Sequence, residues 1–509
     1  MTLKTFDLFV IGGGINGCGI ARDAAGRGLS VCLAEMGDLA SATSSNSTKL
    51  IHGGLRYLEH YEFKLVRKAL REREVLWRIA PHIVRPLRFT LPHHPGLRPA
   101  WLIRLGLFLY DHLGGRELLP GTRKVDMMRD DVGAPLQTTF KEGFEYSDCW
   151  VDDARLVVLN AVDAAERGAQ ILVRTKVISA RREDGLWLIS TQNVDGTQQS
   201  FRAKVLVNAA GPWVDEVLTQ AVAKNDASKV RLVRGSHIVV PKMFDHDGCY
   251  IFQNSDGRIL FAIPYEDSFT LVGTTDVDHL GDSNDIRISD DEVDYLCRSV
   301  SAYFKQPLER SNIVWTYSAV RPLIDDGKAQ AQAATRDYQI NADAASGQAP
   351  LINVFGGKIT TYRRLAEEVM TVLEAHEVPV GSTWTETASL PGGEFEVGEF
   401  STQLKQIEDD YSFLTPRHAH RLLRQYGTRA RVILGDATAY ADLGQCFGSD
   451  LYEAEIRYQV EREWVMQADD AIWRRTKEGL NLSPADKERL EEFLVNHRMP
   501  REQAARAGG

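Results

Sequence analysis

The sequence lacks the residue patterns that define several classes of protein. Its six cysteines stand far apart, with no CxxC pair and no cysteine–histidine cluster, which excludes a zinc finger, a cysteine-ligated iron–sulfur centre and a disulfide framework. We therefore expect no metal, and a reducing, cytosolic setting. The first residues lead into a strand without the apolar stretch of a signal peptide, and no run reaches the roughly 18 apolar residues that a membrane span needs. An exported or membrane-spanning protein is not expected.

A general excess of positive charge is also missing. The formal net charge is -10, which argues against binding to nucleic acid. Residues 49–124 depart from this average, because they include fifteen basic and six acidic residues. Such an excess is typical of a solvated face, and the alternative is a surface that meets an anionic lipid or an anionic substrate.

The chain is long enough for two or three domains, since 509 residues exceed the usual size of one hydrophobic core. Residues 7–11 form a short apolar run that ends in glycines, residues 15–27 suit a helix, and residues 29–35 form a second apolar run. This order predicts a βαβ unit with parallel strands. The apolar runs 204–207 and 350–355 predict further buried strands, and the first of them completes a doubly wound sheet.

Other patterns follow in the middle and at the end of the chain. Residues 170–207 alternate like antiparallel strands, with turns at the Asp-Gly pairs 184–185 and 195–196. Residues 231–276 contain several apolar runs between turn residues, which predicts a second, mainly antiparallel sheet in a lid or substrate domain. Beyond residue 390 the strand signals fade and helical periodicity remains, so we expect a helical C-terminal domain.

The glycine-rich residues 12–17 read GGGING, which fits the GxGxxG pattern directly after a predicted strand and at the start of a predicted helix. In such a unit the glycines let backbone amides approach a pyrophosphate, and the helix N-terminus adds partial positive charge. Glu35, about 20 positions later, is placed to accept hydrogen bonds from a ribose. These features predict a dinucleotide site, but they do not separate FAD from NAD.

Two longer segments favour FAD over NAD, because of the family that they resemble. Residues 11–28, IGGGINGCGIARDAAGRG, and residues 356–366, GGKITTYRRLA, resemble the two signatures of FAD-dependent glycerol-3-phosphate dehydrogenases. The likeness runs from about residue 5 to beyond residue 475 and shows no departure within the motifs. Further similar segments are residues 42–57, 144–156, 234–237, 273–276 and 315–322.

The resemblance implies an α/β fold with three domains. They are a Rossmann-like FAD-binding domain, an inserted antiparallel β substrate domain as in glucose oxidase and D-amino-acid oxidase, and a C-terminal helical domain. The FAD-binding domain is expected to be discontinuous and to comprise residues 1–80, 145–228 and 325–385. The substrate domain is expected at residues 81–144 and 229–324, and the helical domain at residues 390–509.

The hydroxyl-rich segment 42–49, ATSSNSTK, would by itself indicate a surface loop. In the family that the chain resembles, this loop contacts the FAD pyrophosphate and approaches the flavin. The next segment, residues 50–57, has paired glycines that allow close approach to a planar ring. The residues expected to bind FAD are Gly12, Gly13, Gly14, Ile15, Asn16, Gly17, Glu35, Met36, Thr43, Ser44, Ser45, Ser47, Thr48, Lys49, Leu50, His52, Gly53, Gly54, Lys176, Val177, Ala209, Gly211, Trp213, Gly356, Gly357, Lys358 and Thr360.

The resemblance further implies oxidation of sn-glycerol 3-phosphate to dihydroxyacetone phosphate, with hydride transfer from C2 to FAD. An arginine can donate two parallel hydrogen bonds to a phosphate, although each basic residue taken alone is more often a surface charge. By resemblance, Arg56, Arg321 and Lys358 converge on the substrate. The expected substrate-binding residues are Arg56, Tyr57, Thr274, Arg321 and Lys358.

Loss of the hydroxyl proton calls for a base that works at about pH 7, which favours histidine. His237 and His52 are the candidates, because each lies in a glycine-containing motif that the family places near the flavin, and the identity of the base stays open. The expected catalytic residues are His237, Arg321 and His52. Asp152, Asp153 and Arg155 are interpreted instead as an ion-pair and helix-start motif.

Reduced flavin must pass its electrons on, and the sequence has no iron–sulfur or haem motif. The resemblance indicates a membrane quinone as the acceptor. The apolar segment 98–113, which bears Trp and Arg, would then lie at a bilayer surface, and a buried core helix is the alternative. We thus expect a cytoplasmic enzyme attached peripherally to the cytoplasmic face of the inner membrane. A homodimer is left open.

Two other functions also stay open. An oxidase would act on the same substrate, pass electrons to oxygen and produce peroxide without added quinone. A flavin-binding redox sensor would show no turnover. The presence of Arg56, Arg321 and Lys358 argues against the sensor, because a protein without turnover has no need of a phosphate clamp.

Overall fold

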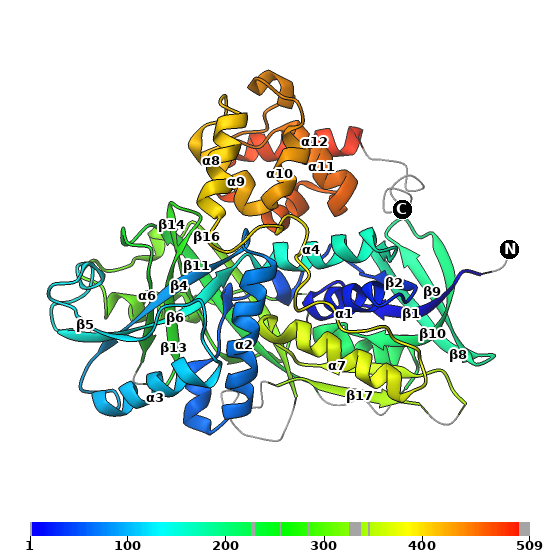
Figure 1. Cartoon of the computed structure of the whole chain (residues 1–509), viewed down its shortest axis with the longest axis horizontal. Helices are drawn as coiled ribbons and strands as arrows, with labels where there is room; N and C mark the ends of the chain where they lie inside the picture. The colour runs from blue at the N-terminus through cyan, green and yellow to red at the C-terminus, as the bar shows by residue number, and fades with distance from the viewer. Residues whose placement is uncertain are drawn as a thin grey trace.

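The computed structural model describes residues 3–224, 230–254, 256–281, 283, 285–324, 337–344 and 347–497. Two β-sheets lie side by side, and a helical domain formed by the end of the chain rests across them (Figure 1). Within the described residues, no helix is long and apolar enough to span a bilayer.

The first sheet is the predicted doubly wound sheet. Its strands follow the order β17-β18-β10-β1-β2-β7, and the antiparallel strands β9 and β8 are attached to β10. β1 pairs in parallel with β2 and β10, and β18 pairs in parallel with β10, as the apolar runs predict. The strands are β1 (Thr5–Ile11), β2 (Val31–Ala34), β7 (Gln170–Leu172), β8 (Thr175–Glu183), β9 (Leu186–Asn193), β10 (Gln198–Asn208), β17 (Gln339–Asp343) and β18 (Leu351–Phe355).

Three helices pack against the first sheet. α1 (Ile15–Gly26) contacts both α4 (Asp153–Glu166) and α7 (Tyr362–Ala375). Small residues on α1 permit this close packing, since a Cβ on Gly19 would lie only 2.6 Å from the ring of Tyr362. The apolar side chains of the three helices and the sheet form one buried cluster. This core holds the N-terminus of α1 at the carboxyl end of β1.

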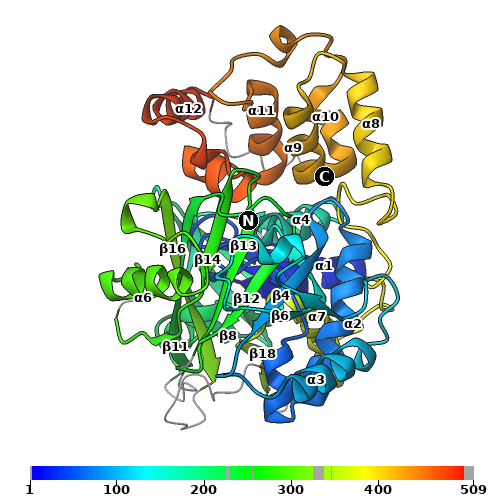
Figure 2. The same ribbon diagram turned by 90° about the vertical axis from the view of Figure 1, so that its left-hand side faces the viewer.

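The second sheet is mainly antiparallel, as predicted. Its order is β15-β11-β14-β13-β12-β4-β6-β3, with β16 on β11 and β5 on β6, and β12 pairs in parallel with β4. Figure 2 shows α6 (Asp290–Ser301) at one end of this sheet and α2 (Phe63–Ile79) and α3 (Ala100–Leu113) at the other. The strands are β3 (Leu50–Ile51), β4 (Val84–His93), β5 (Arg123–Asp126), β6 (Glu142–Val151), β11 (Val230–Pro241), β12 (Cys249–Gln253), β13 (Ile259–Tyr265), β14 (Phe269–Gly273), β15 (Val277–Asp278) and β16 (Trp315–Ile324).

Two strands of the second sheet come from parts of the sequence that are expected in the FAD-binding domain. β3 lies within residues 1–80, and β6 runs across the expected boundary at residue 145. The second sheet therefore begins directly after the hydroxyl-rich loop. The division into domains by residue number remains a prediction.

The helical domain is joined to the rest of the molecule by buried contacts. The ring of Trp473 stacks on that of Trp315 in β16, with 4.4 Å between ring centroids. Two buried ion pairs add to this contact, Arg155–Glu463 at 2.6 Å and Arg475–Asp38 at 2.7 Å. The helices of the domain are α8 (Phe400–Asp410), α9 (Pro416–Tyr426), α10 (Ala430–Leu434), α11 (Glu453–Glu463) and α12 (Pro484–Asn496).

Candidate active site

A cavity of 620 Å³ opens at the carboxyl ends of β1, β2 and β10, where the glycine-rich turn enters α1. Parallel sheets bind nucleotide cofactors at this edge. Residues expected to bind FAD line much of the cavity. They are Gly12, Gly14, Ile15, Asn16, Glu35, Met36, Thr43, Ser44, Lys176, Val177, Ala209, Gly211, Trp213, Gly356 and Gly357.

The remaining residues expected to bind FAD are not in the wall of this cavity. They are Gly13, Gly17, Ser45, Ser47, Thr48, Lys49, Leu50, His52, Gly53, Gly54, Lys358 and Thr360. The sequence analysis also missed part of the wall, because the helical turns after β10 and the neighbouring strands carry no motif. The lining residues that it missed include Ser41, Gln192, Pro212, Glu216, Val217, Gln220 and Pro322, whereas Ala42 belongs to the loop 42–49 that was expected to contact FAD.

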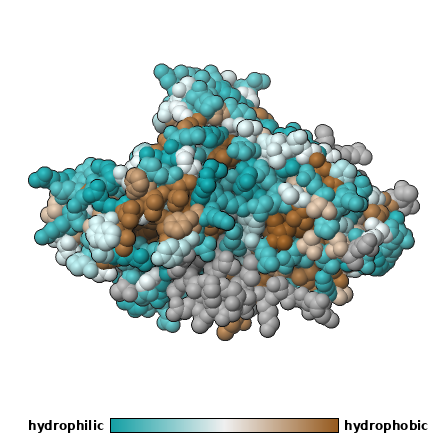
Figure 3. Space-filling view, turned by 60° about the horizontal axis from the view of Figure 1, so that its bottom comes forward, coloured by the Kyte–Doolittle hydropathy of each residue, from teal (hydrophilic) through white to brown (hydrophobic). Residues whose placement is uncertain are grey.

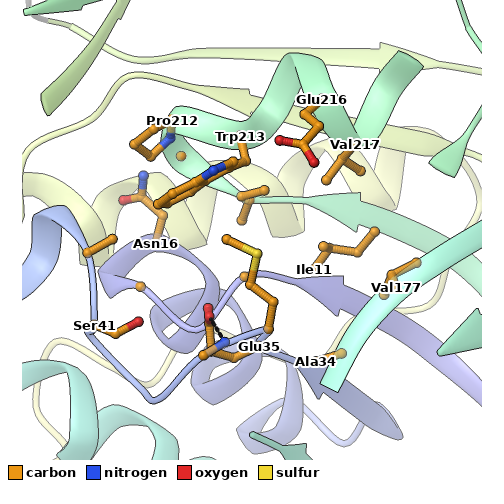
Figure 4. A pocket seen from close by; sticks show the side chains of 18 of the residues that line it. Ile11, Asn16, Ala34, Glu35, Ser41, Val177, Pro212, Trp213, Glu216 and Val217 are labelled. Atoms are coloured by element: carbon orange, nitrogen blue, oxygen red, sulfur yellow. Dashed lines mark hydrogen bonds between the residues drawn. The ribbon is translucent and has the colours of Figure 1, made fainter. Parts of the chain in front are cut away.

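Glu35 forms one side of the cavity, and Trp213 lies across from it (Figure 4). The Glu35 carboxylate accepts hydrogen bonds from the amides of Gly13 at 2.6 Å and Gly37 at 2.7 Å. Burial raises the pKa of Glu35, and the two amide donors act against this rise. Each carboxylate oxygen has a second lone pair, so Glu35 retains the capacity to accept a hydrogen bond from a ribose hydroxyl.

The polar groups of the wall suit an adenine dinucleotide such as FAD. The Oδ1 of Asn16 and the Nε1 of Trp213 are buried and have no hydrogen-bond partner among the described residues. Buried polar atoms are normally paired, so the Asn16 acceptor and the Trp213 donor are suited to hydrogen bonds with a ligand (Figure 4). The first turn of α1 adds backbone amides that no helical carbonyl satisfies, which favour a pyrophosphate.

A buried ion pair holds the hydroxyl-rich loop, residues 42–49, in place. The Nζ of Lys49 lies 2.7 Å from the Oδ1 of Asp153, and Ser47 Oγ donates to the Oδ2 of the same carboxylate at 2.7 Å. Tyr317 Oη donates to the Ser47 carbonyl at 2.8 Å. Lys49 and Ser47 thus hold the loop, and Asp153 has the structural role expected of it. Asp152 caps α4 by accepting from the Arg155 amide at 3.1 Å, again as expected.

His237 lies on β11 of the second sheet and is fully buried. Its Nε2 is 3.0 Å from Thr48 Oγ1, and its ring stacks on that of Tyr317, with centroids 4.7 Å apart. Burial lowers the pKa of His237 well below 6.5, and the positive charges of Arg321 and Lys49 lower it further. The imidazole is therefore neutral at pH 7, as a proton acceptor must be.

Arg321 lies on β16, next to the strand that carries His237. Its Nη2 donates to Thr274 Oγ1 at 3.2 Å, and its Nη1 forms an ion pair with Asp276. A side chain at Gly235 would fill this space, since a Cβ there would lie 2.7 Å from Arg321 Nη2. Gly235 and the pairing role of Asp276 could not be predicted from the sequence, because no spacing rule links them to Arg321.

Of the other three substrate candidates, Lys358 and Tyr57 are in contact. The Nζ of Lys358 lies over the ring of Tyr57, 3.9 Å from its centroid. Gly54 makes room for that ring, because a Cβ there would lie 2.2 Å from it. Arg56 is half-buried and has no ion-pair partner in the described part of the chain. A Cβ at Gly356, two residues before Lys358, would lie 3.6 Å from the carbonyl of Pro322, the residue after Arg321.

A buried polar network supports the Gly53–Gly54 turn, and the sequence analysis missed it. The Gly53 amide donates to Tyr110 Oη at 2.8 Å, and Tyr110 Oη donates to Asp148 Oδ2 at 2.8 Å. Arg73 Nη1 pairs with Asp148 Oδ1 at 2.7 Å. Burial raises the pKa of Asp148, and the Arg73 charge opposes the rise. These residues come from α2, α3 and β6, so no local pattern connects them.

We expect Tyr110→Phe to lower the free energy of unfolding by about 1–3 kcal/mol, because the Gly53 amide and Asp148 lose a buried partner. Urea denaturation of the FAD-loaded protein measures the change. Tyr265→Phe is the matched control, since the buried Tyr265 Oη has no hydrogen-bond partner among the described residues. Equal losses in both variants would show that the Tyr110 hydroxyl does not support the turn.

Comparisons with known proteins agree with this geometry. The family described as FAD dependent oxidoreductase matches residues 7–363, and the family described as C-terminal domain of alpha-glycerophosphate oxidase matches residues 383–493. The chain is 53% identical to D-erythritol 1-phosphate dehydrogenase of Brucella abortus, across 97% of this chain and 98% of that protein. It is 50% identical to aerobic glycerol-3-phosphate dehydrogenase of Escherichia coli, across 98% and 99% of the two chains.

A solved structure has the same arrangement over almost the whole chain. It is the glycerol-3-phosphate dehydrogenase from Bacillus halodurans complexed with FAD, with a TM-score of 0.77 at 27% identity, covering 99% of this chain and 93% of that chain. The chain belongs to the FAD-dependent oxidoreductases, in the group of the glycerol-3-phosphate dehydrogenases. The predicted cofactor FAD, the predicted fold class and the prediction of an enzyme are confirmed. The roles of single residues remain predictions.

Proposed function

We propose that the protein oxidises sn-glycerol 3-phosphate to dihydroxyacetone phosphate and passes the electrons to a membrane quinone. The observation that carries this proposal is the cluster of Arg321 on β16, His237 on the adjoining strand β11 and Thr274 directly after β14. Pro322, next to Arg321, lines the cavity that fits FAD. A guanidinium that can bind a phosphate and a neutral imidazole near the cofactor site support the oxidation of a phosphorylated alcohol.

FAD, when bound, supplies the acceptor for the hydride that leaves C2. The guanidinium of Arg321 is shaped to donate two hydrogen bonds to the substrate phosphate, and Arg56 and Lys358 add positive charge. His237 takes the hydroxyl proton, because its buried imidazole is neutral. Its Nδ1 has no hydrogen-bond partner in the described part of the chain, so a ring nitrogen remains for this contact. His52, whose amide donates to Thr360 Oγ1 at 3.3 Å, is the second candidate base.

His237→Ala is expected to slow flavin reduction by substrate about a hundredfold while FAD content is unchanged, the lower end of the usual effect of a general base. The pH profile gives a second measurement. Because the pKa of His237 lies well below 6.5, kcat/KM of the unchanged enzyme should hold as the pH falls to 6.5 and decline only at lower pH. In the variant this decline should disappear. Near-normal flavin reduction by His237→Ala would remove this residue from the role and leave His52.

The substrate needs a direct test, because the relatives at 53% and 50% identity are named for different polyol phosphates. Glycerol 3-phosphate and D-erythritol 1-phosphate are each added without oxygen to the FAD-loaded protein, and loss of the flavin colour is followed. We expect faster bleaching by glycerol 3-phosphate and recovery of colour with a quinone analogue. Faster bleaching by the erythritol ester would move the assignment to the longer substrate. Peroxide formation without quinone would indicate the oxidase.

We also propose that α3 attaches the protein to the cytoplasmic face of the inner membrane. Only Leu107 and Tyr110 of this helix are buried. Its apolar stripe faces outward, with Trp101 68% and Phe108 55% exposed, and Leu105 and Leu109 are exposed on the same face. Apolar surface is visible on this side of the molecule in Figure 3. An amphipathic helix of this kind fits a bilayer surface better than a core position.

The double variant Trp101→Ser/Phe108→Ser should bind vesicles of bacterial phospholipid at least about tenfold more weakly, since each large side chain contributes roughly 1.5–3 kcal/mol when it is buried. Co-sedimentation with the vesicles measures the change. The control is Val194→Ser/Leu280→Ser, which removes two exposed apolar side chains far from α3 in the sequence. Equal binding by both double variants would contradict attachment through α3.

A further inference from the structure

A second cavity, of 380 Å³, lies between α2 and α7 and shares no lining residue with the cavity that fits FAD. The two helices lie side by side (Figure 1), and the pair Arg363–Glu72 at 2.6 Å joins them. The walls of the cavity are strongly basic. Its lining residues are Lys64, Arg67, Lys68, Arg71, Glu72, Val75, Arg363, Arg364 and Glu386.

The basic residues of α2 occupy one face of that helix. Lys64, Arg67, Lys68 and Arg71 are three or four positions apart, the spacing at which side chains of a helix are neighbours. Like charges at this spacing destabilise a helix, so the arrangement is unfavourable without a counter-charge. Lys68 has a partner in Glu368 at 2.6 Å. For Lys64, Arg67 and Arg71 the described part of the chain shows no ion pair.

The acids around the cavity are already engaged or lie at its rim. The Glu72 carboxylate accepts two hydrogen bonds from Arg363, at 2.8 and 2.6 Å. Arg364 pairs with Glu367 at 2.6 Å. Glu386 is exposed and comes from the segment after α7. The charges on the floor of the cavity are thus paired and held in place. On the α2 wall, Lys64, Arg67 and Arg71 form no ion pair in the described part of the chain.

Arg67 and Arg71 are exposed, as Lys64 is, but they also line a cavity whose floor is cross-linked, which a merely solvated basic face does not require. Arginine is suited to a phosphate, because its planar group donates two parallel hydrogen bonds. We propose that this cavity binds a phosphate group, carried either by a phospholipid headgroup or by a free phosphate. The lipid source would rest on the membrane attachment proposed above, and the free-phosphate source would not.

Three double variants test the site in the FAD-loaded protein. Arg67→Gln/Arg71→Gln removes the clamp, Arg67→Lys/Arg71→Lys keeps its charge but not the two-pronged donors, and Arg181→Gln/Lys204→Gln makes the same charge change at exposed positions elsewhere. Two affinities are measured, for inorganic phosphate by calorimetric titration and for phosphatidylcholine vesicles with and without phosphatidylglycerol. Phosphate bound at the substrate site adds the same signal in every variant.

The Gln variant is expected to lose about tenfold in affinity for at least one of these probes, the effect of about one charge-assisted hydrogen bond, and the Lys variant part of this. The Arg181/Lys204 control should lose little. Loss for vesicles that contain phosphatidylglycerol alone assigns the site to a lipid headgroup, and loss for inorganic phosphate assigns it to a free phosphate. Full affinity in the Lys variant, or a loss of affinity in the Arg181/Lys204 control equal to that in the Gln variant, would overturn the proposal. Either result would mean that the anion is attracted by the positive charge of the surface and not by a site with arginine donors. Unchanged affinity for both probes would also overturn it.

The test is independent of the proposed reaction. None of the altered residues lies in the substrate cluster or in the cavity that fits FAD, so flavin reduction by glycerol 3-phosphate should be the same in all three variants. A protein that fails to bleach with this substrate but shows the expected loss of phosphate binding would refute the proposed function and keep the second site.

Discussion

Arg321→Ala is expected to lower kcat/KM for glycerol 3-phosphate about a thousandfold, because truncating one partner of a hydrogen-bonded charge pair costs about 2–5 kcal/mol. The loss should appear both in KM and in kcat, because binding of the phosphate also positions C2 against the flavin. FAD content should stay normal, because Arg321 does not line the cavity that fits FAD. Steady-state kinetics and the visible flavin spectrum together measure these effects.

The surroundings of Arg321 make this loss larger than that of a surface arginine. Its guanidinium is held between Thr274 and Asp276 in a space that Gly235 keeps open. The arginine is thus oriented before the substrate arrives, and little conformational entropy is lost on binding. Arg321→Lys should recover only a small part of the activity, because lysine keeps the charge but not the fork of donors.

Arg231 provides a matched control on the neighbouring strand. It also pairs with an aspartate, Asp278, at 2.7 Å, but that carboxylate is 46% exposed, against 13% for Asp276. Arg231→Ala removes an ion pair at the surface, which contributes about 0–1 kcal/mol, so kcat/KM should be nearly unchanged. If Arg321→Ala and Arg231→Ala gave similar kinetics, the phosphate clamp would have to lie elsewhere, with Arg56 and Lys358 as the remaining candidates.

The sheets could be predicted from the sequence because their strands carry local signals. Residues 7–11 and 204–207 are short apolar runs beside small-residue turns, and the structure pairs them in parallel. The antiparallel strands of residues 170–207 are marked by alternation and by Asp-Gly turns. β6 was harder to place in a domain, because a strand that is buried along its whole length has the same pattern in either sheet.

The support of the site could not be predicted, because it depends on contacts between distant residues. Tyr110, Asp148 and Arg73 meet only in the folded chain, and each of them read alone is an ordinary aromatic, acidic or basic residue. The same holds for Asp276, because no spacing in the sequence links it to Arg321, with which it pairs. Segment 98–113 shows a related limit, because helical periodicity identifies an apolar face but does not say what covers it. In the structure only Leu107 and Tyr110 of α3 are buried, so this segment is not a buried core helix.

The glycine-rich turn offers a prediction that separates folding from cofactor binding. A Cβ on Gly17 would lie 1.9 Å from the Gly12 carbonyl oxygen, a backbone atom that cannot move aside alone. Gly17→Ala should therefore lower the free energy of unfolding by about 3 kcal/mol or more, the upper end of the usual cost of overpacking. A Cβ on Gly14 would meet only Ser44 Oγ, at 3.1 Å, so the fold should tolerate Gly14→Ala.

Gly14 lines the cavity, so its added methyl group would occupy space that the backbone leaves for the FAD pyrophosphate. We expect Gly14→Ala to unfold at nearly the same urea concentration as the unchanged protein when both lack FAD, but to bind FAD at least about tenfold more weakly, as an interrupted phosphate contact predicts. Urea denaturation of the two apoproteins and titration with FAD measure the two effects. Normal FAD affinity in Gly14→Ala would mean that the turn positions α1 but does not itself approach the cofactor, and the phosphate contact would then fall to the amides beyond Gly14.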